Sequence, residues 1–367
     1  MTAELKQAII QEIRNAPAGR IPFRRYMELA LYHPRWGYYT GNRKKLGPEG
    51  DFYTSPFVGE VFGRTWGRFL RRFWGQAPFV LVEAGAGDGR LTEQILREWI
   101  REGLSPKEVV SYLLDVSPDH RAQQQQRLHE FRGIVHWVDN WDQIPPGGCT
   151  CIISNELLDA MPFHRVRQRQ GCLLEIYVTL APDQEGFAEC EGPLSTPELA
   201  RYIEEMDVHL TEGQETEINL EAKQWIHDAT QWWERGLLIT VDYGGLSHEL
   251  TAPHRLKGTW RCYENHRLHT DVYQNPGEAD ITADVNFTAL ERWGHQLGLR
   301  RWVYQSQSRF LQGAGILDWV QPVQSADPFH PDHKRNRAVR QLIAPGGMGD
   351  AFQVMIQTKG LCLPRWP

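Results

Sequence analysis

The sequence predicts an α/β protein with a Rossmann-like, mainly parallel sheet, and three observations support this prediction. From Phe79 onward, short apolar runs alternate with helical patterns, as in parallel sheets covered by helices. The stretch "FVLVEAGAGDGRL", residues 79–91, ends an apolar run in an acid and then places three glycines at every second position. The chain of 367 residues is long enough for one such domain with insertions, or for two domains.

Helices and a loop precede the alternating region. Residues 1–75 are expected to form an N-terminal helical and lid segment. Ile9, Ile10 and Ile13 make one apolar stripe, and "RRYMELALYH" repeats its period until Pro34. The loop that follows, "GYYTGNRKKLGPEGDFYTSPF", is rich in glycine, proline and aromatic residues, which favour irregular structure.

The alternating region begins with four strands. They are expected at residues 79–84, 109–116, 133–139 and 149–156, with helices at 91–102 and 117–131. Ser117 is the expected N-cap of the second helix, and Pro118 fits its first position. The segment "LLDAM", residues 157–161, is expected to form a short helical turn that Pro162 ends.

Two insertions interrupt the alternation. Residues 164–180 predict an antiparallel hairpin, residues 181–219 are acidic and weakly periodic, and residues 246–285 are polar and rich in His and Asp. The remaining expected elements are a helix at 221–236, strands at 237–245 and 299–307, a helix at 286–298, two short helices and a last strand at 350–359. We therefore predict an α/β domain from residues 76–180 and 220–367, with a substrate-side subdomain from 181–219 and 246–285.

Composition and charge exclude several classes of protein. The formal net charge of −6 gives no bulk positive charge for a nucleic-acid partner. Cys149 and Cys151 lack a matching pair at zinc-site spacing, so no metal is expected. The N-terminus lacks the layout of a secretory signal, and no apolar run approaches the roughly 20 residues of a membrane span. These features predict a cytoplasmic enzyme without membrane insertion.

The glycine turn narrows the choice of ligand. Counted from Gly85, the sixth position of the dinucleotide fingerprint G-x-G-x-x-G is Arg90, and Gly89 comes one residue too early. The sequence also does not match the phosphate-binding P-loop motif, since no Lys-Ser or Lys-Thr pair follows the glycines. Gly85, Gly87 and Gly89 suit the methionine part of S-adenosylmethionine (SAM), and Glu83 would face its cationic groups.

Polar residues at two later strand ends complete the expected nucleoside site. Asp115 suits the ribose hydroxyls, although NAD-binding folds place an acid in the same way. Asp139 or Asn140 suits the adenine edge. Capping of the following helices stays open as the alternative role of these side chains.

Five segments together resemble the MidA-type (DUF185) family of SAM-dependent methyltransferases. They are "EGDFYTSPFVGEVFG", "EAGAGDG", "SNELLDAMPFHR", "VDYGG" and "YENHRLHTDVYQNPGEADITADVNFTAL". The resemblance runs from about residue 18 to the C-terminus and implies the class I methyltransferase fold, whose seven-stranded sheet has an antiparallel last strand. Mitochondrial members methylate an arginine on a core subunit of respiratory complex I and support its assembly.

Two features depart from the family pattern. "GRIPFRRYM" replaces the more usual glycine-proline opening, and the acidic insertion aligns poorly, so the surface for a protein substrate stays open. The chain starts near the family core without a presequence, which indicates a bacterial member.

The resemblance also implies catalytic residues. A guanidinium with a pKa above about 12 needs carboxylates that hold it through forked hydrogen bonds. Glu156 ends the fourth strand, and Asp159 shares its face if the segment is helical. Asn155 would orient the nucleophile, or else cap the turn. His164 is a weaker candidate.

Further segments are expected to enclose the ligands. "GDFYTSP" would close over SAM as a lid with Asp51, Tyr53, Thr54 and Ser55, or form a structural turn fixed by Pro56. The acceptor pocket would be lined by Asp242, Tyr243 and His266. Negative charge for a cationic acceptor would come from Asp271, Asp280 and Asp284, or else these three carboxylates belong to an ordinary solvated surface.

The leading hypothesis is a SAM-dependent protein methyltransferase acting on an arginine of a complex I-like NADH or plastoquinone oxidoreductase subunit. The alternatives are a non-catalytic SAM-binding assembly factor and a methyltransferase with a small-molecule acceptor. A NAD-dependent oxidoreductase is disfavoured by the misplaced third glycine. A homodimer stays open.

Overall fold

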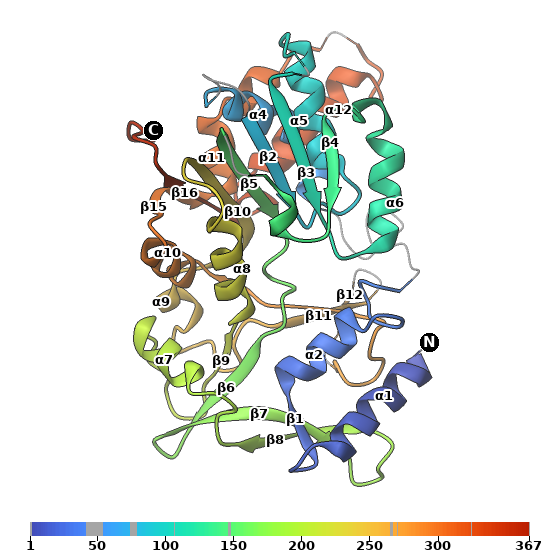
Figure 1. Ribbon diagram of the computed structural model, residues 1–367, viewed down its shortest axis with the longest axis vertical. Coiled ribbons are helices and arrows are strands. Elements are labelled where there is room, and N and C mark those ends of the chain that lie inside the picture. The colour runs from blue at the N-terminus through green and yellow to red at the C-terminus, as the bar shows by residue number, and fades with distance from the viewer. Residues whose placement is uncertain are drawn as a thin grey trace. The chain divides into compact units, whose positions relative to one another are not determined.

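The structure, a computed structural model, describes residues 2–41, 54–73, 79–105, 107–145, 148–264, 267–269, 271–323 and 325–366. The chain forms two compact units (Figure 1). Unit 1 comprises Met1–Lys45, Leu158–Ile226 and Gly244–Arg292, and unit 2 comprises Leu46–Leu157, His227–Tyr243 and Trp293–Pro367. These bounds differ from the predicted division, because residues 158–180 belong to unit 1, where residues 177–179 pair with residues 20–22 of the N-terminal segment.

Unit 2 contains a twisted sheet with the strand order β15-β16-β10-β5-β2-β3-β4 (Figure 1). The strands are β2 (Phe79–Ala84), β3 (Val109–Leu114), β4 (Val135–Val138), β5 (Cys149–Asn155), β10 (Gly236–Gly245), β15 (Arg300–Ser306) and β16 (Phe352–Lys359). Only β16, the last strand of the chain, runs antiparallel to its neighbours on this path, β10 and β15. The class I methyltransferase fold is therefore confirmed.

Helices of unit 2 pack on this sheet around one apolar core. They are α3 (Ser55–Val58), α4 (Val61–Arg71), α5 (Arg90–Arg101), α6 (Pro118–Arg127), α11 (Gln307–Gly313), α12 (Pro331–Ile343) and α13 (Met348–Ala351), with 3₁₀ turns η1 (His129–Phe131), η2 (Trp141–Gln143) and η3 (Ile316–Trp319). Ser117 caps α6 by accepting from the His120 N–H, and Pro118 takes the first helical position, as predicted.

Unit 1 is built on an antiparallel sheet with the order β1-β7-β6-β9, to which β8 adds beside β7. Its strands are β1 (Arg20–Pro22), β6 (His164–Arg169), β7 (Cys172–Leu180), β8 (Phe187–Gly192) and β9 (Glu215–Ile218). The hairpin predicted at 164–180 is confirmed as β6 and β7. The insertion at 181–219, expected to be irregular, supplies β8, α7 (Glu198–Glu205) and β9, because its polar strands are stabilised by ladder pairing.

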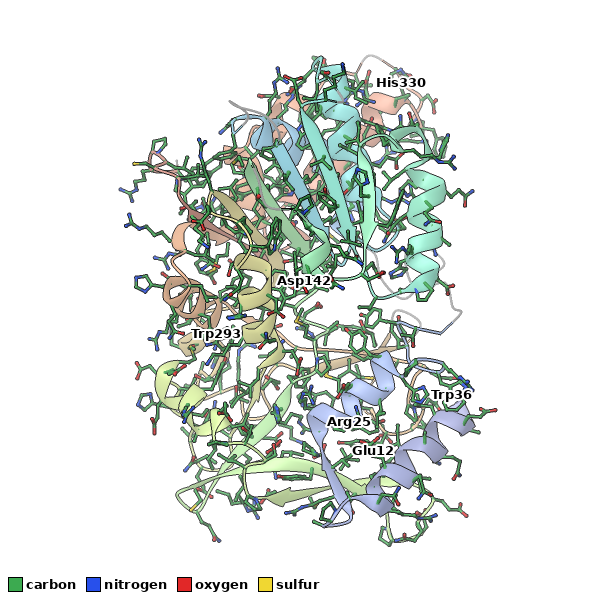
Figure 2. All side chains as sticks on the ribbon, in the orientation of Figure 1. Glu12, Arg25, Trp36, Asp142, Trp293 and His330 are labelled. Atoms are coloured by element: carbon green, nitrogen blue, oxygen red, sulfur yellow. The ribbon has the colours of Figure 1, made fainter. Side chains whose placement is uncertain are left out.

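The rest of unit 1 consists of helices and a small sheet. Glu12 of α1 (Thr2–Asn15) and Arg25 of α2 (Phe23–Tyr32) point toward one another (Figure 2), with forked bonds of 2.5 and 3.0 Å. The small sheet has the order β12-β11-β13. Its strands and the neighbouring elements are α9 (Ser247–Leu250), β11 (Arg261–Glu264), β12 (Arg267–His269), β13 (Asp280–Thr282) and β14 (Val285–Asn286).

Two helices contain residues of both units: α8 (Glu221–Thr230) and α10 (Phe287–Gln296). In the described parts of the chain, no helix combines the length and the apolar character that crossing a bilayer requires.

Candidate functional site

The glycine turn after β2 owes its alternating pattern to the backbone. Gly85, Gly87 and Gly89 have φ values of +70°, +53° and +80°, all in the left-handed region. Glycine is the residue that adopts this region without a steric penalty. Alternate left-handed residues shape the tight turn that connects β2 to α5.

Close packing adds a second reason for glycine at two of these positions. A Cβ on Gly85 would lie 2.7 Å from Leu157 Cδ1, and one on Gly89 would lie 3.2 Å from Gln124 Cγ. The turn therefore lies against the residue that follows Glu156 on one side and against α6 on the other. The predicted cofactor turn and the predicted catalytic segment are neighbours within unit 2.

Glu83 ends β2 in a buried position. Its Oε2 accepts from the Thr92 N–H at 3.1 Å and from the Thr92 hydroxyl at 2.5 Å. Burial raises the pKa of the Glu83 carboxyl to about 8, although both bonds from Thr92 oppose the rise. The carboxyl therefore anchors the start of α5 in this structure, and its contact with a cationic ligand stays a prediction.

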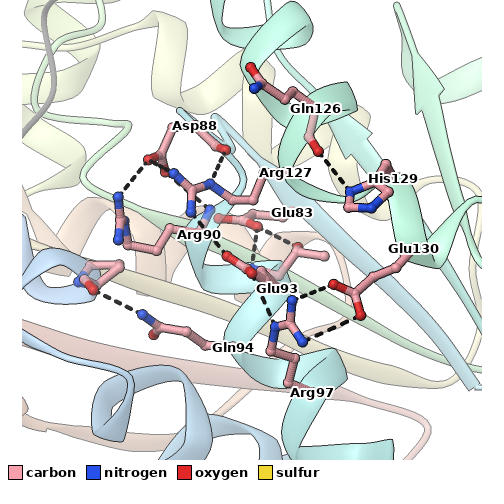
Figure 3. Close-up of polar contacts among 12 residues, drawn as sticks. Glu83, Asp88, Arg90, Glu93, Gln94, Arg97, Gln126, Arg127, His129 and Glu130 are labelled. Carbon is pink, nitrogen blue, oxygen red and sulfur yellow. Dashed lines mark hydrogen bonds and ion pairs between the residues drawn. The ribbon is translucent and has the colours of Figure 1, made fainter.

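Asp88 and Arg90 rigidify the end of the turn (Figure 3). The Asp88 carboxylate pairs with Arg90 at 3.1 Å and with Arg127 of α6 at 2.8 Å. The Arg90 guanidinium also lies 4.1 Å from the centroid of the Phe57 ring in α3. The side chain that replaces the third glycine of a dinucleotide turn thus joins the turn to α3.

Asp115, at the end of β3, holds the middle of the turn. Its Oδ2 accepts from the Gly87 N–H at 3.0 Å, and its Oδ1 accepts from the Ser117 N–H at 2.8 Å. Gln124 of α6 donates to the Gly87 carbonyl at 2.8 Å. Asp115 is therefore fixed at the carboxyl edge of the sheet, where a ribose contact is expected.

Asp139 and Asn140 follow β4 and are both exposed. The Asp139 carboxylate pairs with Arg121, and its N–H donates to Gln143 Oε1 at 2.7 Å. Their predicted contact with adenine stays a prediction.

The helical turn expected at residues 157–161 is a hydrogen-bonded turn in the structure, with the Met161 N–H donating to the Leu158 carbonyl at 3.3 Å, and these residues form no helix.

Glu156 directly follows β5. Its φ is +55°, in the left-handed region, where a non-glycine residue costs roughly 1–3 kcal/mol. The Glu156 N–H donates to the Val241 carbonyl at 2.9 Å, and the Leu157 N–H donates to Asp242 Oδ2 at 3.2 Å. These bonds, one to the backbone and one to a side chain of β10, hold the strained conformation.

The Glu156 carboxylate meets two donors on one oxygen. Asn155 Nδ2 lies 3.0 Å from Oε1, and the Ser55 N–H lies 3.4 Å from the same atom. Asn155 Oδ1 is buried and has no hydrogen-bond partner among the described residues. A strained, hydrogen-bonded carboxylate beside such an acceptor is an arrangement that functional sites favour over structural turns.

Asp242 is fully buried at the end of β10, and its Oδ1 accepts from the Tyr243 N–H at 2.9 Å. The Tyr243 ring packs on Phe352, with centroids 3.9 Å apart. Asp242 thus supports the backbone beside Glu156, a role that the strand pattern did not indicate.

Asp159 lies in unit 1, so its pairing with Glu156 stays a prediction. Burial raises the pKa of its carboxyl to about 6, while Arg261 opposes the rise and Asp284 adds to it. Asp284 itself pairs with Arg261 at 2.6 Å. These side chains form a mixed-charge cluster within unit 1.

The other candidates of unit 1 have structural partners. His164 Nδ1 lies 2.7 Å from the buried Glu175 carboxylate, inside the β6–β7 pair. Asp280 accepts from the Tyr39 hydroxyl at 2.9 Å, and the exposed Asp271 accepts from the Tyr273 N–H.

Three predicted residues, Asp51, Tyr53 and His266, lie outside the described residues. Thr54 is the N-cap of α3, and its side chain makes no capping bond. Within the described ranges, no three His, Cys, Asp or Glu side chains gather as metal ligands.

Three polar residues near the site were not predicted from the sequence: Thr92, Gln124 and Gln307. Their hydrogen bonds depend on partners that are distant in the sequence.

Comparisons with known proteins agree with this geometry. A family model described as "Putative S-adenosyl-L-methionine-dependent methyltransferase" matches residues 60–305. A solved structure from Burkholderia thailandensis, bound to S-adenosyl-homocysteine, is 30% identical with a TM-score of 0.89. The match covers 99% of this chain and 94% of that one.

Two curated relatives carry more specific names. The Danio rerio protein arginine methyltransferase NDUFAF7, mitochondrial, is 28% identical over 91% of this chain and 82% of its own length. The Drosophila melanogaster homolog of the same name is 29% identical over 73% of this chain, but the match spans only 65% of its own length. Because both are named mitochondrial, they contradict the cytoplasmic location predicted from the sequence, and that prediction is wrong.

Proposed function

Because the chain belongs to the family of S-adenosyl-L-methionine-dependent methyltransferases whose model it matches, we propose that it methylates an arginine side chain of a protein. The curated relatives, named protein arginine methyltransferases, support the choice of acceptor. The resemblance to the MidA-type family extends the proposal to a subunit of a complex I-like NADH or plastoquinone oxidoreductase.

One observation carries the proposal: Glu156 has a strained backbone and a hydrogen-bonded carboxylate, and the next residue, Leu157, lies against Gly85 of the glycine turn. A guanidinium offers only N–H donors and stays charged, so its binding requires acceptor oxygens. Glu156 supplies a carboxylate, and Asn155 Oδ1 is a buried acceptor to which no described residue donates. Together they suit a forked contact that turns one guanidinium nitrogen toward the cofactor.

The residues present fit SAM. The left-handed glycine turn at the end of β2 suits its methionine part, and the fixed Asp115 carboxylate suits its ribose. When bound, SAM supplies an electrophilic methyl group on a sulfonium. The protein's own task is then to orient the acceptor nitrogen and to hold carboxylates beside the guanidinium. Their negative charge stabilises the guanidinium while its positive charge becomes less delocalised during attack.

The test combines purified protein, tritiated SAM and lysate of a strain that lacks the gene, followed by mass spectrometry of labelled proteins. We expect a labelled arginine and a loss of about 100-fold in rate for Glu156→Gln, because a neutral amide holds a cation poorly. Glu234→Gln, an exposed position of unit 2, is the matched control and should retain full activity.

Other outcomes identify the alternatives. Binding of S-adenosylhomocysteine without any labelled product would indicate a non-catalytic assembly factor. Label confined to the small-molecule fraction would indicate a small-molecule acceptor. Full activity of Glu156→Gln would contradict the catalytic assignment.

A further inference from the structure

Gln307 is a fully buried polar residue at the edge of the sheet where the candidate site lies. It begins α11 directly after β15, which ends at Ser306. In the sheet, Ser306 and Asp242 both pair with Gln353 of β16, from opposite sides. Ser306, the last residue of β15, therefore lies level with Asp242 of β10, and Gln307 comes immediately beyond that level.

A chain of two contacts connects Gln307 to Glu156. The Ser55 hydroxyl donates to Gln307 Oε1 at 3.2 Å, and the Ser55 N–H faces Glu156 Oε1 at 3.4 Å. Ser55 is also fully buried, and its hydroxyl lies 3.7 Å from Met348 Sδ of α13. Gln307 thus fixes α3 at the residue whose backbone touches the proposed catalytic carboxylate.

The amide nitrogen of the Gln307 side chain lowers the stability of the fold. Its Nε2 is buried without a hydrogen-bond partner in the described part of the chain, which costs roughly 1–3 kcal/mol. A leucine would fill a similar volume without this penalty, so stability alone does not account for a glutamine here. Unsatisfied buried polar groups of this kind call for a functional explanation.

We propose that Gln307 is a positioning residue for methyl transfer that acts through Ser55 on Glu156. By fixing Ser55, it keeps one of the two donors on Glu156 Oε1 in place, the other being Asn155 Nδ2. Two donors on one oxygen limit rotation of the carboxylate, and a misaligned carboxylate would aim the guanidinium poorly. The inference rests on the function proposed for Glu156.

The test measures kinetics of Gln307→Leu, Ser55→Ala and the double variant with the labelled acceptor protein. We expect each single variant to lower kcat about tenfold, because catalysis is sensitive to small misplacements of the acceptor. The KM for the acceptor and the Kd for S-adenosylhomocysteine should stay within about twofold. The double variant should lose no more than either single variant, since the two side chains act as one unit.

Gln312→Leu is the matched control, because Gln312 lies exposed on the same helix and bonds to Ser308 of that helix. It should behave like the unmodified protein. If Gln307→Leu does not fold, as judged by S-adenosylhomocysteine binding and thermal unfolding, Ser55→Ala carries the test, since it retains the backbone N–H. A normal kcat in Ser55→Ala then refutes the inference.

The failure of this inference is distinguishable from that of the proposed function. If Glu156→Gln loses activity while Gln307→Leu keeps it, or if the two losses add fully in the double variant, only the positioning role is wrong. If the unmodified protein methylates no arginine, the proposed function fails first.

Discussion

Gly85 shows how one residue can serve both the backbone and the packing of a site. Its φ of +70° needs glycine, and the space that a side chain would take is filled by Leu157. Gly103, after α5, has a φ of +82°, but a Cβ at this position would meet no atom of the described residues within 4 Å. A side chain at Gly103 would therefore meet only backbone strain, whereas a side chain at Gly85 would meet backbone strain and a clash with Leu157.

Alanine substitution at these two glycines gives a matched pair. Gly103→Ala should lower the free energy of unfolding by about 1–2 kcal/mol, the cost of a left-handed alanine. Gly85→Ala should cost more, because Leu157 must also shift, and it should weaken S-adenosylhomocysteine binding at least about tenfold. Urea unfolding and calorimetry measure both effects; equal destabilisation of the two variants would show that Leu157 yields easily.

The sequence predicted the positions of residues well where local structure follows from local pattern. The glycine turn, Asp115 at a strand end and Ser117 as an N-cap all depend on near neighbours, and each lies where the pattern puts it. Glu156 was found, but its left-handed conformation was not, because bonds to Val241 and Asp242 impose it from 85 residues away. No motif or spacing near Gln307 in the sequence predicts its contact with Ser55.

At the scale of elements, the contact between Glu83 and Thr92 joins β2 to the first turn of α5. A carboxyl whose pKa is raised to about 8 stays protonated in the folded protein well above pH 4.5, whereas it ionises in the unfolded chain. The unfolded state therefore binds fewer protons in this range. The stability that this group contributes is full below pH 4.5 and is lost as the pH rises toward 8.

This linkage predicts a pH dependence that one substitution removes. Between about pH 5 and pH 8, the free energy of unfolding should fall more steeply for the unmodified protein than for Glu83→Gln, which cannot ionise. Asp159, also with a raised pKa, adds a decline of the same sign to both proteins, so the difference between them isolates Glu83. Parallel curves from urea titrations across this range would contradict the assignment.

Elements with strong periodicity or clear caps were predicted from the sequence, including the parallel strands, whereas the antiparallel direction of β16 was implied only by the family resemblance. The failures occurred where tertiary bonds override local preference. "LLDAM" has a helical composition, yet in the structure it forms a turn and no helix, and the Leu157 N–H at its start donates to the Asp242 side chain of β10. The insertion at 181–219 lacks apolar alternation, yet β8 and β9 form because β7 and β6 offer ladder partners.

At the scale of the whole molecule, the described residues proposed to hold the cofactor all belong to unit 2. The glycine turn, Asp115 and Glu156 lie in Leu46–Leu157. A ligand that binds only the folded form of this unit stabilises it by mass action. At about 100 times its Kd, the gain is about 2.7 kcal/mol, which raises Tm by several degrees for a chain of this size.

Differential scanning calorimetry can therefore test the choice between a SAM-type and a dinucleotide ligand. S-adenosylhomocysteine should raise Tm by several degrees, and the same concentration of NAD should leave it unchanged. The reason is structural: Arg90 occupies the position of the third dinucleotide glycine, and its guanidinium is engaged by Asp88 and Phe57. The turn therefore lacks the glycine that permits close helix–strand packing in a pyrophosphate turn. An equal shift with NAD would contradict this argument, whereas a shift with S-adenosylhomocysteine alone would support it independently of any acceptor.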